Sequence, residues 1–513
     1  MTLKMAGGDP ISRDAFKQKI GRVATALKNE GLREGDSVAL LLRNDLTFLE
    51  VEQAAAITGI LPVPLNWHNA PEETRYVLED CGAKLVVAHS DLYNAAGSAA
   101  FPDGVKVVIL STPPSVREAF GLAPSTADLP DAAVEYTAWR DACEPTFQDN
   151  PPMPSSVIYT SGTTGHPKGV VRNPRTAEQA MASRNALIEI YGLAGIEGAT
   201  VRTAIIGPHY HAAPTTHANF CYSRGADIVV VPRFDAEALL ALIEKERITH
   251  LNMVPIMFSR MLKLPPEVRS AYDLSSLRYI SHAAAPCPPD VKRAMIEWLG
   301  PIISEFYGST EMGNITLCSS QEWLERPGTV GRKLKGAGLL VVDDAGNEVP
   351  PNTIGTILGR GPGLTDFVYR NREDETTGCF MNGLIVPGDA GYVDEDGYLF
   401  ICDRNKDMII SGGVNIYPAE IEAVLHAMDD IADCAVFGIP DEEYGESICA
   451  HVQMQEGASR DPKAIQDRLR DKLAGYKVPR KIVFEDALPR EDSGKVKKFH
   501  LRAPYWEAAG RRI

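Results

Sequence analysis

The sequence predicts an α/β protein with a large N-terminal domain of helix-covered sheets plus a small β subdomain, followed by a small α+β C-terminal domain. Helical and strand patterns alternate from residue 14 to about 110 and resume after residue 154. Short strand patterns with tight turns begin near residue 338, and a compact α+β pattern follows residues 404–412. Alternation with continuous apolar strands is typical of parallel sheets covered by helices. A chain of 513 residues is also too long for one core.

The first domain begins with three helical patterns that alternate with three buried strands. Helical spacing covers 16–30, 47–60 and 71–81, and apolar strands cover 38–42, 84–88 and 105–110. Residues 111–154 are rich in Pro, Ala, Asp and Ser, which predicts a long surface connection. The alternation then resumes, with strands at 157–159, 227–231, 250–254 and 276–280 and a helix at 236–246.

The remaining elements are shorter. An apolar strand at 339–342, with turn signals at 344–346 and 396–397, predicts a small subdomain of antiparallel strands. The last part of the chain shows helices at 418–428 and 462–473, strands at 434–437 and 448–453, and a basic tail that extends to 502. We place the domain boundary at about 405, which divides the chain into 1–405 and 406–513.

Composition narrows the class of protein. An apolar content of 44% and a charged content of 23% are ordinary for a soluble globular protein. The net charge of −16 argues against non-specific nucleic-acid binding. Nine cysteines without a C-x-x-C pair predict reduced thiols. No apolar run approaches the roughly 18 residues that span a bilayer, and the N-terminus lacks a signal-peptide core. We therefore expect a cytoplasmic protein, and leave open peripheral membrane contact and a homodimer.

The stretch from Tyr159 to Val170 carries a pattern suited to holding phosphate. Glycines let backbone N–H groups approach an anion, hydroxyls add donors, and a lysine adds positive charge. Clusters of Ser, Thr and Gly are also common in plain surface turns. The apolar strand at 157–159 and the lysine favour the functional interpretation. The residues concerned are Thr160, Ser161, Gly162, Thr163, Thr164, Gly165, Lys168 and Gly169.

This stretch resembles the phosphate-loop signature of the AMP-forming acyl-CoA synthetases, which are relatives of luciferase and of the peptide-synthetase adenylation domains. A second hallmark of that family matches Tyr307-Gly308-Ser309-Thr310-Glu311. An aromatic ring can stack on a base, a hydroxyl can donate to phosphate, and a carboxylate can hold Mg²⁺. The resemblance implies that Tyr307 stacks on adenine with Gly308 and Ser309 beside it. It also implies that Thr310 touches the α-phosphate and that Glu311 binds Mg²⁺.

Further segments match the nucleotide site of the family. Asp389 follows Pro-Gly and, with Arg404, is implied to hold the ribose, although Gly-Asp is also a common turn. Lys406 stands at the position of the family's hinge, where a charged surface turn is the alternative. The adenine-edge segment corresponds to Ala284, Ala285 and Pro286, and here alanines at 283 and 284 replace two glycines of the family pattern.

Three more segments match the chemistry of acyl transfer. Lys495 follows Ser493-Gly494 and matches the family's catalytic lysine, which neutralises charge during adenylation. Gly412 and Gly413 are implied to approach the tunnel for coenzyme A. His211 is implied to stand at the gate of the acyl pocket. Histidines at 209, 211 and 217 could suggest zinc, but no cysteine or acidic ligand is near them in the sequence.

The resemblance implies a ligase that uses ATP, Mg²⁺ and coenzyme A. A carboxylate would attack ATP to give acyl-AMP, and rotation of the C-terminal domain would then permit transfer to coenzyme A. Small residues at 212, 213 and 313 leave room for a medium or long fatty acid, with an aromatic or steroid acid second. An adenylating enzyme that loads a carrier protein is a further alternative. A non-catalytic nucleotide-binding regulator is the least favoured.

Overall fold

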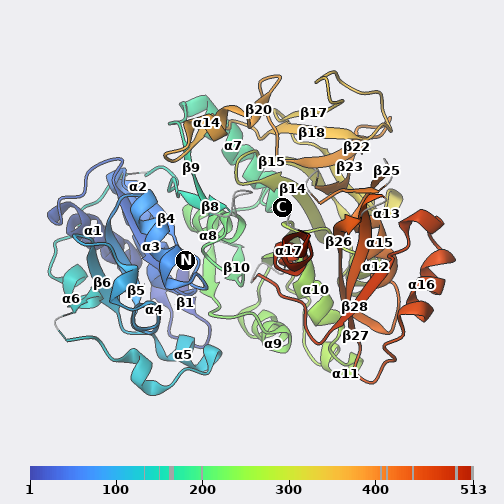
Figure 1. Cartoon of the computed structure of the whole chain (residues 1–513). Coiled ribbons are helices and arrows are strands. Elements are labelled where there is room, and N and C mark those ends of the chain that lie inside the picture. The colour runs from blue at the N-terminus through green and yellow to red at the C-terminus, as the bar shows by residue number, and fades with distance from the viewer. Residues whose placement is uncertain are drawn as a thin grey trace. The chain divides into compact units, whose positions relative to one another are not determined.

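A computed structural model describes residues 1–131, 133–149, 151–160, 167–197, 200–404, 407–411, 414–441, 444–491 and 495–509. The chain divides into two compact units (Figure 1). Unit 1 comprises 1–253, 263–282 and 363–378, and unit 2 comprises 254–262, 283–362 and 379–513. Both units mix helices with sheets, so the predicted α/β class is confirmed. Residues 405 and 406 lie outside the described residues, and the predicted domain boundary there stays a prediction.

Unit 1 contains a parallel five-stranded sheet near the N-terminus. Its order is β4-β3-β5-β6-β7, with β3 Ser37–Leu41, β4 Leu61–Pro64, β5 Ala83–His89, β6 Lys106–Leu110 and β7 Val134–Glu135. Helix α1 Arg13–Asn29 precedes the first of these strands, and α2 Leu46–Thr58, α3 Pro71–Asp80 and α4 Ser90–Ala96 lie between successive strands. Every predicted helix and strand in residues 14–110 is therefore confirmed, with ends that differ by a few residues.

The predicted surface connection over 111–154 is wrong. It contains α5 Pro114–Phe120, the fifth strand β7 and α6 Tyr136–Asp141. Tyr136 is only 1% exposed, and its hydroxyl donates to Glu50 Oε1 at 2.9 Å. Arg140 Nη1 pairs with the same carboxylate at 3.2 Å. Because these contacts join α6 to α2, a segment with a polar composition becomes part of the core.

Two further sets of strands belong to unit 1. One has the order β2-β1-β11-β10-β12-β13, parallel except for β1 with β2; its members are β1 Thr2–Met5, β2 Ile11–Ser12, β10 Arg202–Ile205, β11 Asp227–Val230, β12 His250–Met253 and β13 Tyr279–His282. The helices α7 Ala177–Ile190, α8 Ala212–Arg224 and α9 Ala236–Glu246 accompany it. The other is antiparallel, in the order β19-β9-β8, with β8 Ile158–Thr160, β9 Lys168–Arg172 and β19 Phe367–Tyr369.

Unit 2 begins with antiparallel strands that include the predicted β subdomain. They run in the order β14-β15-β16-β23-β22-β18-β21-β20, and β17 pairs with β18. The ranges are β14 Ile303–Ser309, β15 Gly313–Cys318, β16 Thr329–Lys333, β17 Gly338–Val342, β18 Gly355–Arg360, β20 Phe380–Met381, β21 Leu384–Ile385, β22 Asp389–Val393 and β23 Tyr398–Arg404. Their helices are α10 Pro255–Leu262, α12 Pro289–Leu299 and α13 Ser320–Glu325. The predicted short antiparallel strands are thus confirmed.

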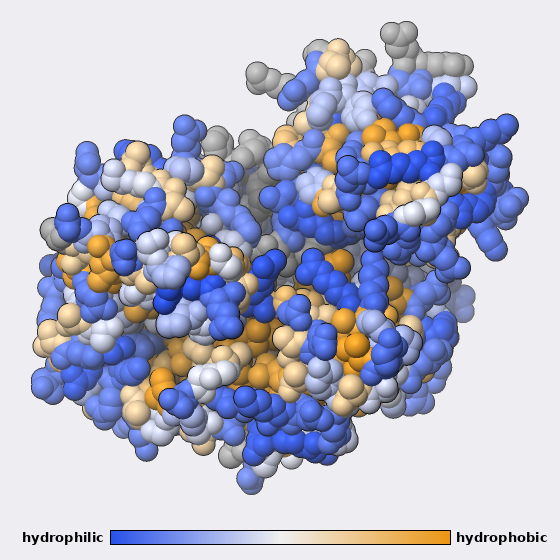
Figure 2. All heavy atoms as spheres, turned by 90° about the horizontal axis from the view of Figure 1, so that it is seen from below, coloured by the Kyte–Doolittle hydropathy of each residue, from blue (hydrophilic) through white to orange (hydrophobic). Residues whose placement is uncertain are grey.

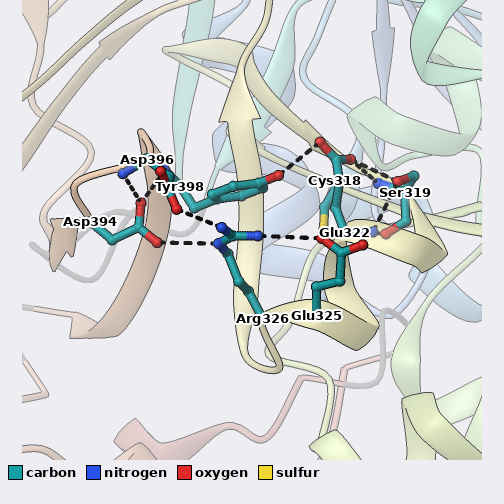
Figure 3. Close-up of polar contacts among 8 residues, drawn as sticks. All are labelled: Cys318, Ser319, Glu322, Glu325, Arg326, Asp394, Asp396 and Tyr398. Atoms are coloured by element: carbon teal, nitrogen blue, oxygen red, sulfur yellow. Dashed lines mark hydrogen bonds and ion pairs between the residues drawn. The ribbon is translucent and has the colours of Figure 1, made fainter.

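A tyrosine at the start of β23 joins that strand to the body of unit 2 (Figure 3). Two guanidinium groups contact the Tyr398 ring, with Arg326 at 4.4 Å and Arg332 at 4.3 Å from its centroid. Arg326 also pairs with Asp396 at 2.5 Å and with Asp394 at 3.7 Å. Contacts between cations and aromatic faces are attractive at about 0.5–1 kcal/mol each at exposed sites. β23 is therefore anchored at its start, six residues before Arg404 ends it.

The last part of unit 2 has its own sheet and core. Its strands are β24 Ile409–Ser411, β25 Val414–Ile416, β26 Ile431–Asp441, β27 Gly445–Met454 and β28 Lys481–Glu485, and its helices are α15 Pro418–His426, α16 Pro462–Arg470 and α17 Lys498–Ala508. The predicted basic tail is corrected: it contains β28, which pairs with β27, and α17. Leu501 and Tyr505 of α17 pack against buried Phe437, so an apolar face orders that segment.

No helix in the described ranges is long and apolar enough to cross a membrane. The face shown in Figure 2 is largely hydrophilic, with scattered apolar patches.

A buried carboxyl group connects α2 with α8 in unit 1. Glu52 is 1% exposed, and it accepts hydrogen bonds from Asn219 Nδ2 at 2.6 Å and from the Ser156 hydroxyl at 2.9 Å. Burial outweighs these two bonds and raises the pKa of Glu52 to about 8. Glu52 is therefore protonated in the folded protein at neutral pH.

Glu52→Gln is expected to stabilise the protein increasingly as the pH rises from about 5 to about 8. Over this range the folded state retains a proton that the unfolded chain has released, so the wild type loses stability while the amide variant does not. Thermal unfolding midpoints of both proteins across this pH range test the prediction. Glu72→Gln, at an exposed position of α3, controls for the lost charge. A constant difference between wild type and Glu52→Gln would contradict it.

Candidate functional site

One hairpin carries the second predicted motif. Tyr307, Gly308 and Ser309 end β14, and Thr310 and Glu311 form the turn to the antiparallel β15. The register of the two strands shifts between Tyr307 and Gly308. A Cβ at Gly308 would overlap the backbone of residues 313 and 314, so only glycine fits there. The Ser309 hydroxyl accepts a hydrogen bond from the Met312 N–H at 3.0 Å and tightens the turn. The turn thus carries a hydroxyl and a carboxylate within four residues of the aromatic side chain.

A direct hydrogen bond joins this hairpin to the predicted ribose-binding residue. The Tyr307 hydroxyl donates to Asp389 Oδ2 at 2.5 Å, and Asp389 is 8% exposed. In the antiparallel pairing of β22 with β23, Asp389 stands opposite Arg404. Tyr307 was predicted from a segment 82 positions before Asp389, and Asp389 and Arg404 were predicted from two neighbouring segments. The structure brings the first two side chains into contact and pairs the third residue with Asp389 through the backbone.

The adenine-edge segment is strained. Ala284 has φ +76°, a left-handed conformation that costs an L residue with a side chain about 1–2 kcal/mol. It is exposed, so packing does not offset this cost. Ala285 and Pro286, the other predicted residues of the segment, have ordinary φ values. Glycine, which the family pattern has at position 284, would adopt this conformation without steric cost, whereas this chain has alanine there.

Lys168, the predicted phosphate-binding lysine, begins β9 and is 8% exposed. Its ammonium pairs with Glu375 of α14, Glu373–Thr377, and lies 5.1 Å from the centroid of the Tyr369 ring. Arg372 Nη1 pairs with the other oxygen of Glu375 at 2.9 Å. The hydrogen bonds from Lys168 and then Arg372 lower the pKa of Glu375. The sequence did not reveal Glu375, because it lies 207 positions away in a run of charged residues.

Hydrogen bonds with α3 fix the two strands that flank the predicted phosphate loop. β8 and β9 pair in antiparallel register from Ile158–Val170 to Thr160–Lys168. The Tyr76 hydroxyl donates to the Pro167 carbonyl at 3.3 Å, and the Tyr159 hydroxyl donates to Asp80 Oδ2 at 2.6 Å. The loop therefore starts and ends on a fixed hairpin. Its predicted binding residues Ser161, Gly162, Thr163, Thr164 and Gly165 lie outside the described residues.

His211 occupies the N-cap position of α8, without a capping hydrogen bond from its side chain, next to a group of aromatic rings. Its ring lies 4.4 Å from that of Tyr210, which contacts Trp67 edge-on at 6.2 Å. Trp67 in turn contacts Phe120 edge-on at 5.4 Å. His209 packs against Phe48, and burial lowers its pKa to about 3. In the described part of the chain no group of three or more His, Cys, Asp or Glu residues is placed to hold a metal ion.

The predicted catalytic lysine lies on a second hairpin. An antiparallel bridge joins Arg490 to Val496, the Glu491 N–H donates to the Lys495 carbonyl at 2.8 Å, and the Lys497 N–H donates to the Pro489 carbonyl at 2.8 Å. Lys495 is partly exposed. The predicted hinge Lys406 and the predicted coenzyme A residues Gly412 and Gly413 lie outside the described residues.

Comparison with protein families decides the identity of the chain. Residues 5–369 match the family model for AMP-binding enzymes, and residues 420–495 match the model for the AMP-binding enzyme C-terminal domain. The chain belongs to the AMP-binding enzyme family. Within it, the relatives described next place it among the AMP-forming acyl-CoA synthetases of the adenylate-forming superfamily.

Three curated relatives cover nearly the whole chain. Indoleacetate–CoA ligase of Aromatoleum aromaticum is 35% identical over 94% of this chain and 91% of its own. Long-chain-fatty-acid–CoA ligase FadD13 of Mycobacterium tuberculosis is 32% identical over 96% and 92%. Fatty acid–[acyl-carrier-protein] ligase ScoC of Streptomyces coeruleorubidus is 32% identical over 99% and 94%. Among solved structures, amide bond synthetase McbA from Marinactinospora thermotolerans superposes with a TM-score of 0.83 at 25% identity, covering 98% and 96% of the two chains.

The predicted enzyme class is therefore confirmed. The chain is an AMP-forming acid–CoA ligase, and the family uses ATP and coenzyme A. The identity of the acid and the roles of individual residues stay predictions.

Ala284→Gly is expected to raise the free energy of unfolding by about 1 kcal/mol, because glycine adopts φ +76° without steric cost. Ala285→Gly, one residue on and without positive φ, is the matched control and is expected to lower it by about 0.5 kcal/mol. Urea unfolding of the three proteins measures both effects. Equal destabilisation by the two glycines would contradict the assignment of strain.

Proposed function

We propose that the enzyme activates a carboxylic acid with MgATP to an acyl adenylate and transfers the acyl group to coenzyme A after rotation about Lys406. The observation that carries this proposal is the hydrogen bond from Tyr307 to Asp389. It unites two segments that were separately predicted to bind a nucleoside, one through the base and one through the ribose. An aromatic face beside a buried carboxylate suits adenosine.

The first half-reaction joins two anions. The carboxylate attacks the α-phosphorus of ATP, the bond to the β-phosphate oxygen breaks, and pyrophosphate leaves with the electron pair. Because the reactants repel each other, catalysis depends on positioning and on positive charge. In this proposal Thr310 donates to the α-phosphate, Lys168 neutralises the leaving phosphates, and Lys495 neutralises charge that develops between acid and phosphate.

Mg²⁺ fits the donors that are present. Glu311 is a single carboxylate in the turn after β14, and Mg²⁺ is commonly held by one or two carboxylates together with substrate phosphates and water. Bound there, the ion would neutralise phosphate charge. Dependence on Mg²⁺ and the role of Glu311 are part of the proposal.

Glu375 gives Lys168 a partner before ATP arrives. A buried ammonium without a counter-charge is costly, and the ion pair with Glu375 offsets that cost. We infer that phosphate oxygens replace Glu375 when the nucleotide binds. The second contact of Glu375, with Arg372, keeps its carboxylate paired after the exchange.

For the acid we propose a medium or long fatty acid; FadD13 is named for long-chain fatty acids and ScoC for fatty acids. An aromatic acid is the second candidate. Trp67, Phe120 and Tyr210 form an aromatic group beside His211, the predicted gate, and indoleacetate–CoA ligase is among the relatives. Flat aromatic acids would stack on such rings. ScoC also favours testing a carrier protein as the acceptor. A cytoplasmic location stays a prediction.

A panel of acids, scored by AMP formation with ATP, Mg²⁺ and coenzyme A, tests the proposal. We expect octanoate and palmitate to give the highest kcat/KM, with indoleacetate and ferulate lower. A preference for the aromatic acids of tenfold or more, about 1.4 kcal/mol, would establish the second candidate. Replacing coenzyme A by a phosphopantetheinyl carrier protein identifies the acceptor. Absence of acid-dependent pyrophosphate release would refute the proposal.

Lys495→Ala is expected to lower the rate of adenylation by at least about 100-fold while it largely spares thioester formation from supplied acyl adenylate. The reason is that the positive charge is needed only while the two anions react. Acid-dependent pyrophosphate exchange measures the first step, and consumption of coenzyme A thiol measures the second. Lys497→Ala on the same hairpin is the control and should leave both rates unchanged. Equal loss in both steps would contradict domain alternation.

A further inference from the structure

The hairpin 489–497 that presents Lys495 is clamped at its first strand by an ion pair. Arg490 Nε donates to Asp433 Oδ2 at 2.8 Å, and Nη2 donates to Oδ1 at 2.5 Å. The two side chains are only 23% and 14% exposed. A bidentate pair between a guanidinium and a carboxylate fixes the plane and direction of both groups, and partial burial shields it from water and salt. This pair is therefore a rigid joint between the hairpin and β26.

Asp433 is itself held in position by the backbone. The pairing of β26 with β27 is irregular between Ile431 and Asp433, where Ile431 stands opposite Met454 and Asp433 opposite Gln453. An extra residue in one strand of an antiparallel pair redirects the neighbouring side chains, and such bulges are frequent next to active sites. Asp433 Oδ1 also accepts the Cys434 N–H at 2.8 Å. The carboxylate thus meets Arg490 in a preset orientation.

A second contact holds the other strand of the hairpin. Lys498, directly after it, pairs with Glu422 Oε1 of α15 at 2.8 Å. The same oxygen of Glu422 accepts the Val436 N–H of β26 at 2.7 Å. The hairpin is therefore attached to β26 directly through Asp433 and indirectly through Glu422. Lys495 lies between these two anchors in the sequence.

We propose that Asp433, acting through Arg490, is the positioning residue for Lys495 in the adenylation step. This inference rests on the proposed catalytic role of Lys495. A lysine side chain is a flexible four-carbon stem, so its ammonium occupies a defined position only if the backbone that carries it is fixed. Displacement of a catalytic group by about 1 Å can cost about 100-fold in rate. The ion pair supplies that fixed backbone without touching the substrate.

The test uses two variants of the pair and one matched control. Asp433→Asn keeps the shape and removes the charge, and Arg490→Lys keeps the charge and removes the bidentate geometry. The control is Asp430→Asn, which breaks another Asp–Arg pair of the same domain, with Arg468 at 2.7 and 2.9 Å. Rates of pyrophosphate exchange and of thioester formation from supplied acyl adenylate are measured for the full-length enzyme, together with thermal unfolding midpoints.

We expect Asp433→Asn and Arg490→Lys to lower kcat for adenylation by about 10- to 100-fold, with little change in KM for ATP and in the thioester step. Asp430→Asn should change neither rate. In a Lys495→Ala background Asp433→Asn should cause no further loss, because its effect passes through the lysine. Equal loss in both half-reactions, additive loss in the double variant, or unchanged adenylation would overturn the inference.

The outcome also separates this inference from the proposed function. If the wild type adenylates an acid and Lys495→Ala abolishes that step while Asp433→Asn does not affect it, only the inference fails. If the wild type releases no pyrophosphate with any acid, or if Lys495→Ala adenylates at the wild-type rate, the proposed function fails.

Discussion

The hydrogen bond between the Tyr307 hydroxyl and the Asp389 carboxylate is the contact on which the proposed nucleotide site depends. It links the end of β14 to the start of β22, two strands that β15, β16 and β23 separate in the sheet order. A buried carboxylate needs a donor, and the tyrosine hydroxyl supplies one. In the proposed site the ring of the same residue stacks on the base. Because the hydroxyl belongs to the ring, the base-stacking and ribose-binding groups cannot shift independently.

Most of the fold was predictable because local pattern and burial agree. The continuous apolar runs of β3, β5 and β6 predicted a parallel sheet, and that sheet is present. The errors arose where tertiary contacts outweigh composition. Residues 111–154 look polar, yet Tyr136 is anchored in the core by Glu50 of α2. The segment that contains α17 looks like a basic tail, yet its Leu501 and Tyr505 pack against Phe437 of β26.

The candidate site also combines features that the sequence predicted with features that it did not. Motifs that are contiguous in sequence, such as the pentapeptide from Tyr307 to Glu311, could be predicted because their residues serve one ligand from one turn. The contacts that support them could not. Glu375 lies far in sequence from Lys168, and Asp433 lies 57 positions before Arg490. Neither carboxylate stands in a recognisable motif, since each is defined only by the partner that folding brings to it.

The attachment of α17 has a consequence for altering the carboxyl end of this enzyme. The Tyr505 hydroxyl forms a hydrogen bond with His451 Nε2 at 3.1 Å, and Trp506 Nε1 donates to the Gly438 carbonyl at 3.1 Å. These two hydrogen bonds attach the helix to β26 and β27. Removing this helix would expose the apolar surface around Phe437. It would also remove Lys498, whose ion pair with Glu422 holds the second strand of the Lys495 hairpin.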